Sequence, residues 1–255
     1  MKIKLLNFIA LIFILCALKI NSQEPVTLIS YADLEDPEFY KNIDPYKIKE
    51  AYFTYLFQIN KLVLLKENKK AISTIMASAE KSYKNGEISK LEQLKIESLY
   101  TNLINEINKT GYDVAITENN LKSILNRDIN ILPEPDTLYK RVSFSLNEFI
   151  DYQKKCVPDS ISQNLPGFII RENLLLKYNK YNDIINFYIL EKLPLGKKIK
   201  EDAKMLLELE EINIFQYSEM ICNAYSIELG YFGALNEYNQ ITVEIEHNYE
   251  TYKNR

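Results

Sequence analysis

A seven-residue apolar repeat occurs twice in this chain, 124 positions apart, and constrains the fold more than any other feature. Apolar or small residues recur at alternating spacings of four and three, first over residues 96–124 and then, in the same phase, over residues 220–248. This spacing predicts long helices that pack lengthwise along a neighbour, and its recurrence predicts an internal duplication. The stripe positions are Ile96, Tyr100, Leu103, Ile107, Thr110, Val114, Thr117, Leu121 and Ile124, then Met220, Ala224, Ile227, Tyr231, Ala234, Tyr238, Ile241, Ile245 and Asn248.

The first stripe is entered through a helix break with capping residues. Asn85-Gly86 offers a left-handed stop for a preceding helix. Ser89 and Glu92 then have the spacing of a capping box. We therefore predict a helix over residues 89–126, preceded by a helix with an apolar face. That face is formed by Ile48, Tyr52, Tyr55, Ile59, Leu62, Ile72, Met76, Ala79 and Tyr83.

The second stripe has an equivalent entry. Asn213 and Gln216 can cap its helix in the same way, but Glu210 replaces Gly86, which predicts a softer break. The stretch before it is also helical in pattern over residues 174–190, and Pro194 with Gly196 is predicted to interrupt it before residues 199–209.

Composition agrees with long, rarely broken helices. Only 6 Gly and 8 Pro occur in 255 residues, which disfavours turn-rich β folds and glycine-dependent nucleotide folds. The prediction is an all-α protein of long antiparallel helical hairpins in two tandem repeats, coiled-coil-like, with little or no β structure. Residues 23–127 form the first repeat and 168–255 the second. Residues 128–167 are a proline-rich linker, in which 138–146 form either a short strand or extended chain.

The N-terminus has the pattern of an export signal. Lys2 and Lys4 precede an apolar run over residues 5–18, and a small residue, Ser22, offers a cleavage site. Residues 1–22 are therefore interpreted as a signal peptide. Cys156 and Cys222 would remain after cleavage, either as a pair or as small buried side chains.

Motifs for chemistry are nearly absent. One His in the chain excludes a multi-His metal site within one copy. The formal charge of −4 gives no bulk cationic surface for nucleic acid. No phosphate-binding loop, Cys-x-x-Cys or nucleophile elbow occurs. We expect no enzyme activity, no catalytic residue, no metal site and no cofactor.

Several segments resemble TolC-like outer-membrane efflux proteins, and most closely their heavy-metal efflux branch. These are YKNGEISKLEQL at residues 83–94, NNLKSIL at 119–125, EINIFQY at 211–217 and ELGYFGALNEYNQ at 228–240. The resemblance covers roughly residues 43–127 and 168–250. It implies homotrimers whose long helices build a periplasmic tunnel, with β-hairpins in the outer membrane. Under this resemblance, we expect the chain to be a shortened member that lacks the β-hairpins.

The resemblance also implies a function. An adaptor protein and an inner-membrane pump dock at the helical tip of such proteins, and metal ions or toxic compounds are exported without chemistry. The expected location is the outer membrane or periplasm of a Gram-negative cell. The expected partner-binding residues are those of the two breaks, namely Gly86, Glu87, Ile88, Ser89, Glu211, Ile212 and Asn213. The alternative is a periplasmic helical interaction or structural protein that has lost the channel.

Overall fold

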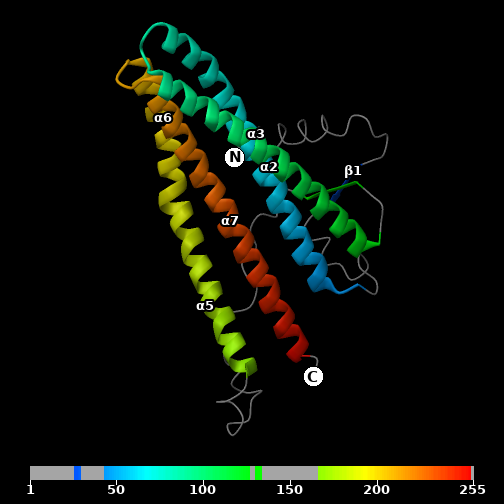
Figure 1. The fold of residues 1–255 in the computed structure, drawn as a ribbon. Coiled ribbons are helices and arrows are strands. Elements are labelled where there is room, and N and C mark those ends of the chain that lie inside the picture. Colours follow the sequence, from blue (N-terminus) through cyan, green and yellow to red (C-terminus); the bar gives the residue numbers. More distant parts are fainter. Residues whose placement is uncertain (1–25, 30–42, 127–129, 134–165, 254–255) are drawn as a thin grey trace. The chain divides into compact units, whose positions relative to one another are not determined.

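The structure of the chain is a computed structural model that describes residues 26–29, 43–126, 130–133 and 166–253 (Figure 1). The chain divides into two compact units, Met1–Leu138 and Tyr139–Arg255, which are taken one at a time below. The predicted signal peptide, the predicted strand at 138–146 and Cys156 all lie outside the described residues.

The first unit is built on one long helical hairpin, called hairpin 1. Its arms are α2 (Pro45–Lys84) and α3 (Lys90–Leu125), which run antiparallel and pack along their length (Figure 1). Ser89 is the N-cap of α3, and Asn126 ends it in a left-handed conformation with φ of 49°. The helix predicted over residues 89–126 is therefore confirmed, caps included.

Local chemistry also explains the start of α2. The Asp44 side chain accepts a hydrogen bond from the Tyr46 amide at 3.0 Å, and Pro45 occupies the first turn. A proline there costs no hydrogen bond, because the first amides of a helix have no partner within the helix.

A short pair of strands lies at the open end of hairpin 1. β1 (Val26–Ile29) precedes α2 and β2 (Asn130–Pro133) follows α3. They pair in parallel, with Val26 opposite Asn130 and Ile29 opposite Pro133. The predicted linker thus contains a strand, and this strand lies at its very start.

The second unit contains hairpin 2, with α5 (Pro166–Phe187), η3 (Tyr188–Lys192) and α6 (Leu193–Glu208) in one arm and α7 (Ile214–Lys253) in the other. The predicted interruption at Pro194 and Gly196 is wrong, because the arm stays helical throughout. Pro194 cannot donate to the carbonyl of Leu190. The chain adapts through the π-helical turn η3, in which the Leu193 amide bonds to the Tyr188 carbonyl.

Small residues lie where this arm meets α7. A Cβ on Gly230 would collide with the hydroxyl of Tyr188. A Cβ on Gly196 would lie 3.5 Å from the Ile227 side chain. Buried Ala203 and Ala224 also belong to these two helices. Small residues therefore allow α6 and α7 to pack closely.

Both predicted stripes are turned inward, since none of their residues is exposed. Leu174 of α5 packs with Ile241 and Ile245 of α7 in one core cluster, and the hydroxyls of Tyr178 and Tyr238 lie 3.0 Å apart. The face predicted on α2 is buried or half-buried as far as Ala79, whereas Tyr83 is 40% exposed. The predicted all-α fold of long helical hairpins is confirmed.

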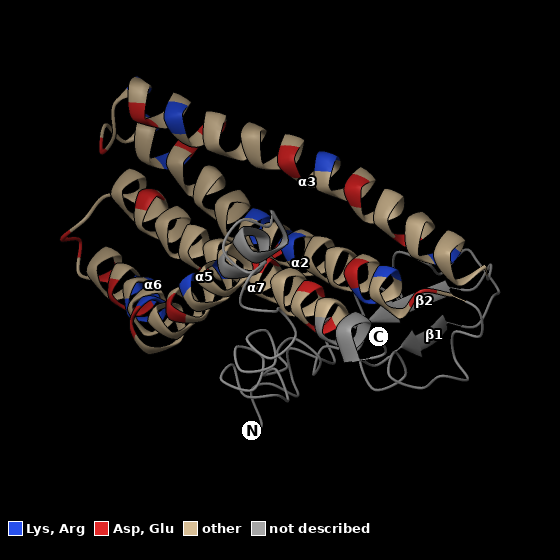
Figure 2. Cartoon of the chain, turned by 90° about the horizontal axis from the view of Figure 1, so that it is seen from below, with Lys and Arg blue, Asp and Glu red and all other residues tan. Residues whose placement is uncertain are grey.

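Ion pairs join the arms of each hairpin. Lys61 of α2 contacts Glu106 of α3 at 2.6 Å, and its hydrogen bond lowers the pKa of Glu106. In hairpin 2, Lys200 contacts Glu228 at 2.8 Å and lies 3.8 Å from the Tyr225 ring centre. Other charges of both signs are scattered along the helices (Figure 2). A stretch able to cross a bilayer is found in none of the helices within residues 43–126 and 166–253.

Candidate functional site: the two helical turns

The turns at the ends of the hairpins form the candidate site. Turn 1 comprises residues 85–89, between α2 and α3. Its amides close the end of α2 through three hydrogen bonds of 2.9–3.0 Å, namely Asn85 to Lys81, Gly86 to Tyr83 and Glu87 to Ser82. Gly86 makes this possible with a left-handed φ of 77°.

Turn 2 comprises residues 209–213, between α6 and α7. It repeats the hydrogen bonds of turn 1 at positions shifted by 124, with lengths of 2.9–3.1 Å. These are Leu209 to Met205, Glu210 to Leu207 and Glu211 to Leu206. The softer break predicted from Glu210 is wrong, because Glu210 takes the same left-handed conformation with φ of 59°.

The caps that follow are equivalent too. The Ser89 hydroxyl accepts from the Glu92 amide at 3.2 Å, and the Glu92 carboxylate accepts from the Ser89 amide at 2.7 Å. Asn213 and Gln216 exchange the same two bonds, both at 2.9 Å. Both predicted capping pairs are confirmed, so each hairpin reverses its chain by the same local mechanism.

The predicted contact residues differ in exposure. Gly86, Glu87, Ser89 and Glu211 are exposed, and Ile212 and Asn213 are half-buried. Ile88 is only 5% exposed. Its side chain therefore fills turn 1 from within, which leaves the neighbouring residues to form the surface.

Several exposed apolar side chains flank the turns, and none was predicted as a contact residue. Tyr83, Leu91 and Leu94 surround turn 1, and Met205 and Leu209 lie at turn 2. Leu91 and Leu94 do not fall on the positions of the stripe. That mismatch is the sequence signal that could have indicated their exposure. Exposed large apolar side chains gathered at one place are typical of interaction surfaces.

The carboxylates in and beside turn 1 are already engaged by neighbouring side chains. The Asn85 amide donates to Glu87 at 2.9 Å and, with the Ser82 hydroxyl, keeps the pKa of Glu87 below its usual value. Glu80 pairs with Lys84 at 2.8 Å, and this lowers the pKa of Glu80. Four lysines and three glutamates occupy residues 80–95.

The segment that contains turn 2 has a net charge of opposite sign. One lysine and four glutamates occupy the equivalent residues 204–219. Within the part of the chain that the structure describes, no side-chain hydrogen bond or ion pair engages Glu210 or Glu211. The two turns therefore have the same backbone conformation, but the segments around them present different charges to a partner.

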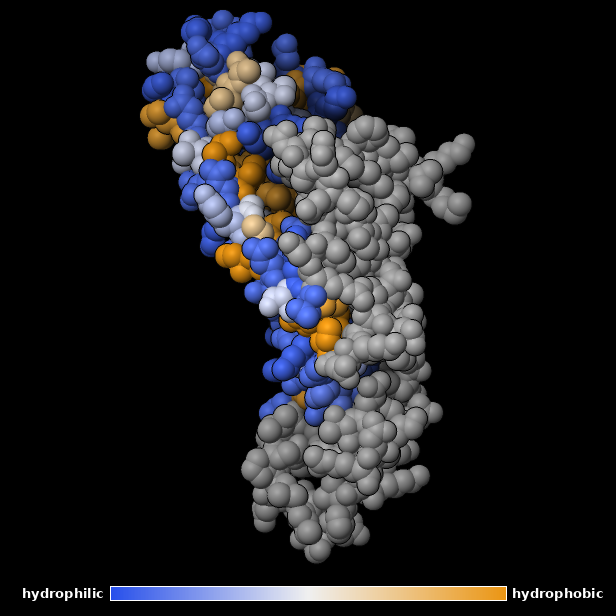
Figure 3. Space-filling view, turned by 90° about the vertical axis from the view of Figure 1, so that its right-hand side faces the viewer, coloured by the Kyte–Doolittle hydropathy of each residue, from blue (hydrophilic) through white to orange (hydrophobic). Residues whose placement is uncertain are grey.

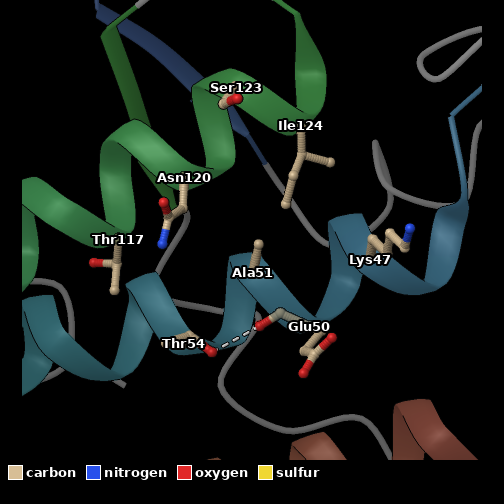
Figure 4. Close-up of a pocket in the computed structure, with 8 residues that line it drawn as sticks. All are labelled: Lys47, Glu50, Ala51, Thr54, Thr117, Asn120, Ser123 and Ile124. Atoms are coloured by element: carbon tan, nitrogen blue, oxygen red, sulfur yellow. Dashed lines mark hydrogen bonds between the residues drawn. The ribbon is translucent and has the colours of Figure 1, made fainter.

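A cavity of about 450 Å³ lies between the arms of hairpin 1, far from turn 1 (Figure 4). Thr54 and Thr117 use their hydroxyls on carbonyls of their own helices, and Glu50 and Ser123 point away from the gap. Its polar groups therefore do not converge on one point, as chemistry would require. The lining is Lys47, Glu50, Ala51, Thr54, Thr117, Asn120, Ser123 and Ile124.

Among the described residues, no group of three or more His, Cys, Asp or Glu side chains could hold a metal ion. No family model, no curated protein and no solved structure matches this chain.

Proposed function

We propose that this protein is a TolC-like component of an efflux complex in a Gram-negative cell, exported to the outer membrane or periplasm. In this proposal it assembles as a homotrimer and docks through turns 1 and 2 on a periplasmic adaptor protein, which links it to an inner-membrane pump. Metal ions or toxic compounds pass through the complex, and the chain itself performs no chemistry.

The observation that carries the proposal is the repetition of one turn geometry at the ends of two long hairpins. Each turn combines a left-handed residue, a reciprocal cap and exposed apolar side chains. A repeated rigid turn offers a partner two platforms of similar backbone geometry. The step from this surface to efflux rests on the sequence resemblance, which is an argument by analogy.

The different charges of the turns refine the expected contact. The helix ends beside turn 1 carry lysines, and the carboxylates of Glu80 and Glu87 there are already engaged, whereas turn 2 offers Glu210 and Glu211. We expect the adaptor to meet turn 2 with basic residues, because complementary charge favours the correct partner and register.

Crosslinking in cells tests the docking surface. A photoreactive residue placed at Glu87 or Glu211, both exposed, should give an adduct that mass spectrometry identifies as an adaptor or pump subunit. The matched control is the exposed Lys177 of α5, which should give none. Absence of such an adduct from both turn positions would overturn the docking proposal.

A deletion strain tests transport. Loss of the gene should sensitise cells to at least one transition-metal ion or toxic amphiphile, and the wild-type gene should restore resistance. A Glu87→Lys/Glu211→Lys variant should be present at normal levels without restoring it. Unchanged resistance across such a panel would argue against efflux.

A second function, that of a periplasmic helical interaction protein without transport, is favoured by the β1–β2 pair. These four-residue strands pair in parallel across the open end of hairpin 1, unlike the antiparallel β-hairpins that the resemblance implies. Fractionation separates the two functions. A trimer in the outer-membrane fraction supports the efflux component, whereas a monomer released by osmotic shock supports the second function.

A further inference from the structure

An exposed apolar cluster surrounds η3, well away from the residues of turn 2. Phe187, Ile189, Leu190 and Leu195, together called the η3 patch, are 51%, 45%, 72% and 48% exposed. Hydrophobic side chains are also exposed among hydrophilic ones elsewhere along the described helices (Figure 3). The η3 patch differs in that four large ones fall within nine positions of one helical arm.

The π turn explains why these side chains face outward. Tyr188 contacts Gly230 of α7, and Gly196 lies against Ile227 of the same helix. The arm is therefore held to α7 at both ends of the turn. Leu190 lies between these two contacts and is the most exposed member of the patch. The equivalent position in hairpin 1 is Lys66, so the patch belongs to the second half only.

Lysines border the patch. Residues 187–198 contain Lys192, Lys197 and Lys198 and one acid, Glu191, in a chain whose formal charge is −4. The Lys192 ammonium lies 5.6 Å from the Phe187 ring centre, and Lys197 is only loosely paired with Glu201 at 3.7 Å. Lysine stems can lie along apolar surface while their charges reach outward.

We propose that the η3 patch binds the surface of a membrane that contains anionic lipids. The apolar side chains would enter the boundary between headgroups and acyl chains, and the lysines would meet the lipid phosphates. A partner helix is a poorer fit, because it needs apolar residues repeated at heptad spacing. The charged residues Asp183 and Glu201 bound the patch instead.

Vesicle flotation with the purified full chain tests this proposal, which does not depend on the efflux function. Vesicles of phosphatidylcholine alone are compared with vesicles of phosphatidylcholine and phosphatidylglycerol in a three-to-one ratio. The protein should float with the anionic vesicles and much less with the neutral ones. Raising the salt concentration should weaken binding, because exposed charges are screened.

Two variants assign the binding to the patch. Phe187→Ser/Leu190→Ser should abolish flotation, and Lys192→Gln/Lys198→Gln should reduce it by about fivefold for each lysine. The matched control is Tyr112→Ser/Ile116→Ser in α3, whose side chains are 74% and 57% exposed, and it should float like the wild type. Circular dichroism checks that each variant remains helical.

Three results would overturn the proposal. The wild-type chain could fail to float with anionic vesicles, or the patch variants could float as well as the wild type. The third is a change in oligomeric state caused by Phe187→Ser/Leu190→Ser in the absence of lipid, which would assign the patch to a second copy of the chain. None of these results bears on docking at turns 1 and 2.

Discussion

Gly86 and Glu210 lie 124 positions apart and occupy the same place in two copies of one helical turn. Both have positive φ, 77° for Gly86 and 59° for Glu210. Only the first residue suits that conformation, since a left-handed backbone costs a residue with a Cβ about 1–2 kcal/mol. The duplicated geometry is therefore maintained in turn 2 against a local preference.

Replacing Glu210 with Gly should stabilise the protein. Relief of the left-handed strain is partly offset by the greater freedom of glycine in the unfolded chain, which leaves a gain of roughly 0.5–1 kcal/mol. Urea denaturation measures this free energy of unfolding. Glu210→Ala is the control and should bring no such gain, because it removes the carboxylate and keeps the Cβ. Gly86→Ala should destabilise by roughly 0.5–1 kcal/mol for the converse reason, and equal stability of all these variants would contradict the argument.

Gly230→Ala should destabilise the protein by about 1–3 kcal/mol, because the new methyl group would meet the Tyr188 hydroxyl. Tyr188→Phe should restore most of that loss in the double variant, which a double-mutant cycle detects as coupling. Gly233→Ala is the matched control in the same helix. A Cβ there meets nothing within 4 Å, so higher helix propensity should add about 0.8–1 kcal/mol. Loss of stability without coupling to Tyr188 would refute the proposed contact.

Tyr55 should make the free energy of unfolding depend on pH in the alkaline range. Burial, and then the adjacent Glu118 carboxylate, raises the pKa of Tyr55 above its usual value. The unfolded tyrosine ionises near pH 10, so its contribution is intact below that pH and is lost as the pH rises toward the folded pKa.

The measurement is the free energy of unfolding of wild type and Tyr55→Phe from pH 7 to 11. The variant should be less stable by about 1–2 kcal/mol at pH 7, because it loses the hydrogen bond to Glu118. The difference should narrow above pH 10. Tyr112→Phe, at a 74% exposed position, should follow the wild type at every pH. A constant difference for Tyr55→Phe would contradict the expected ionisation effect.

Thr110→Val should stabilise the protein by about 1 kcal/mol. Thr110 is fully buried in the stripe of α3, and its hydroxyl oxygen has no hydrogen-bond partner. Burying an unpaired hydroxyl is costly, while valine has nearly the same shape and helix propensity. Thermal unfolding gives the comparison. Thr101→Val serves as the control, because its exposed hydroxyl already donates to the Glu97 carbonyl at 2.9 Å; a lower melting temperature for Thr110→Val would refute the expectation.

Much of the fold could be predicted from side-chain spacing, because long helices bury one regular stripe. The spacing places Thr110 and Tyr238 on the packing stripes, and both are buried. The pairs Ser89–Glu92 and Asn213–Gln216 indicate the helix starts. The apolar spacing and the capping pairs each involve residues only a few positions apart, so both can be recognised in a single sequence.

Features that depend on tertiary context could not be predicted in this way. Proline is a helix breaker by local rules, but contacts of Tyr188 and Gly196 with α7 hold the arm helical through η3. Glu210 adopts a conformation that its own preference opposes. At the candidate site, spacing located both turns but did not reveal that Ile88 is buried. The β1–β2 pair joins segments far apart in the chain, and neither is long enough to show alternation.

The antiparallel course of α2 and α3 has a consequence for the order of folding. Facing residues are nearest in sequence beside turn 1 and grow more distant toward the end where Val26 pairs with Asn130. The entropy lost on closing a loop rises with the chain between its ends. We expect the two arms of hairpin 1 to pair first beside turn 1 and then progressively toward the other end, with the strands pairing last. Pulsed hydrogen exchange should therefore show early protection of amides near Gln93 and late protection near Leu121. A defect in turn 1 would then delay every later contact of the hairpin, whereas loss of the strand pair would leave early folding unchanged.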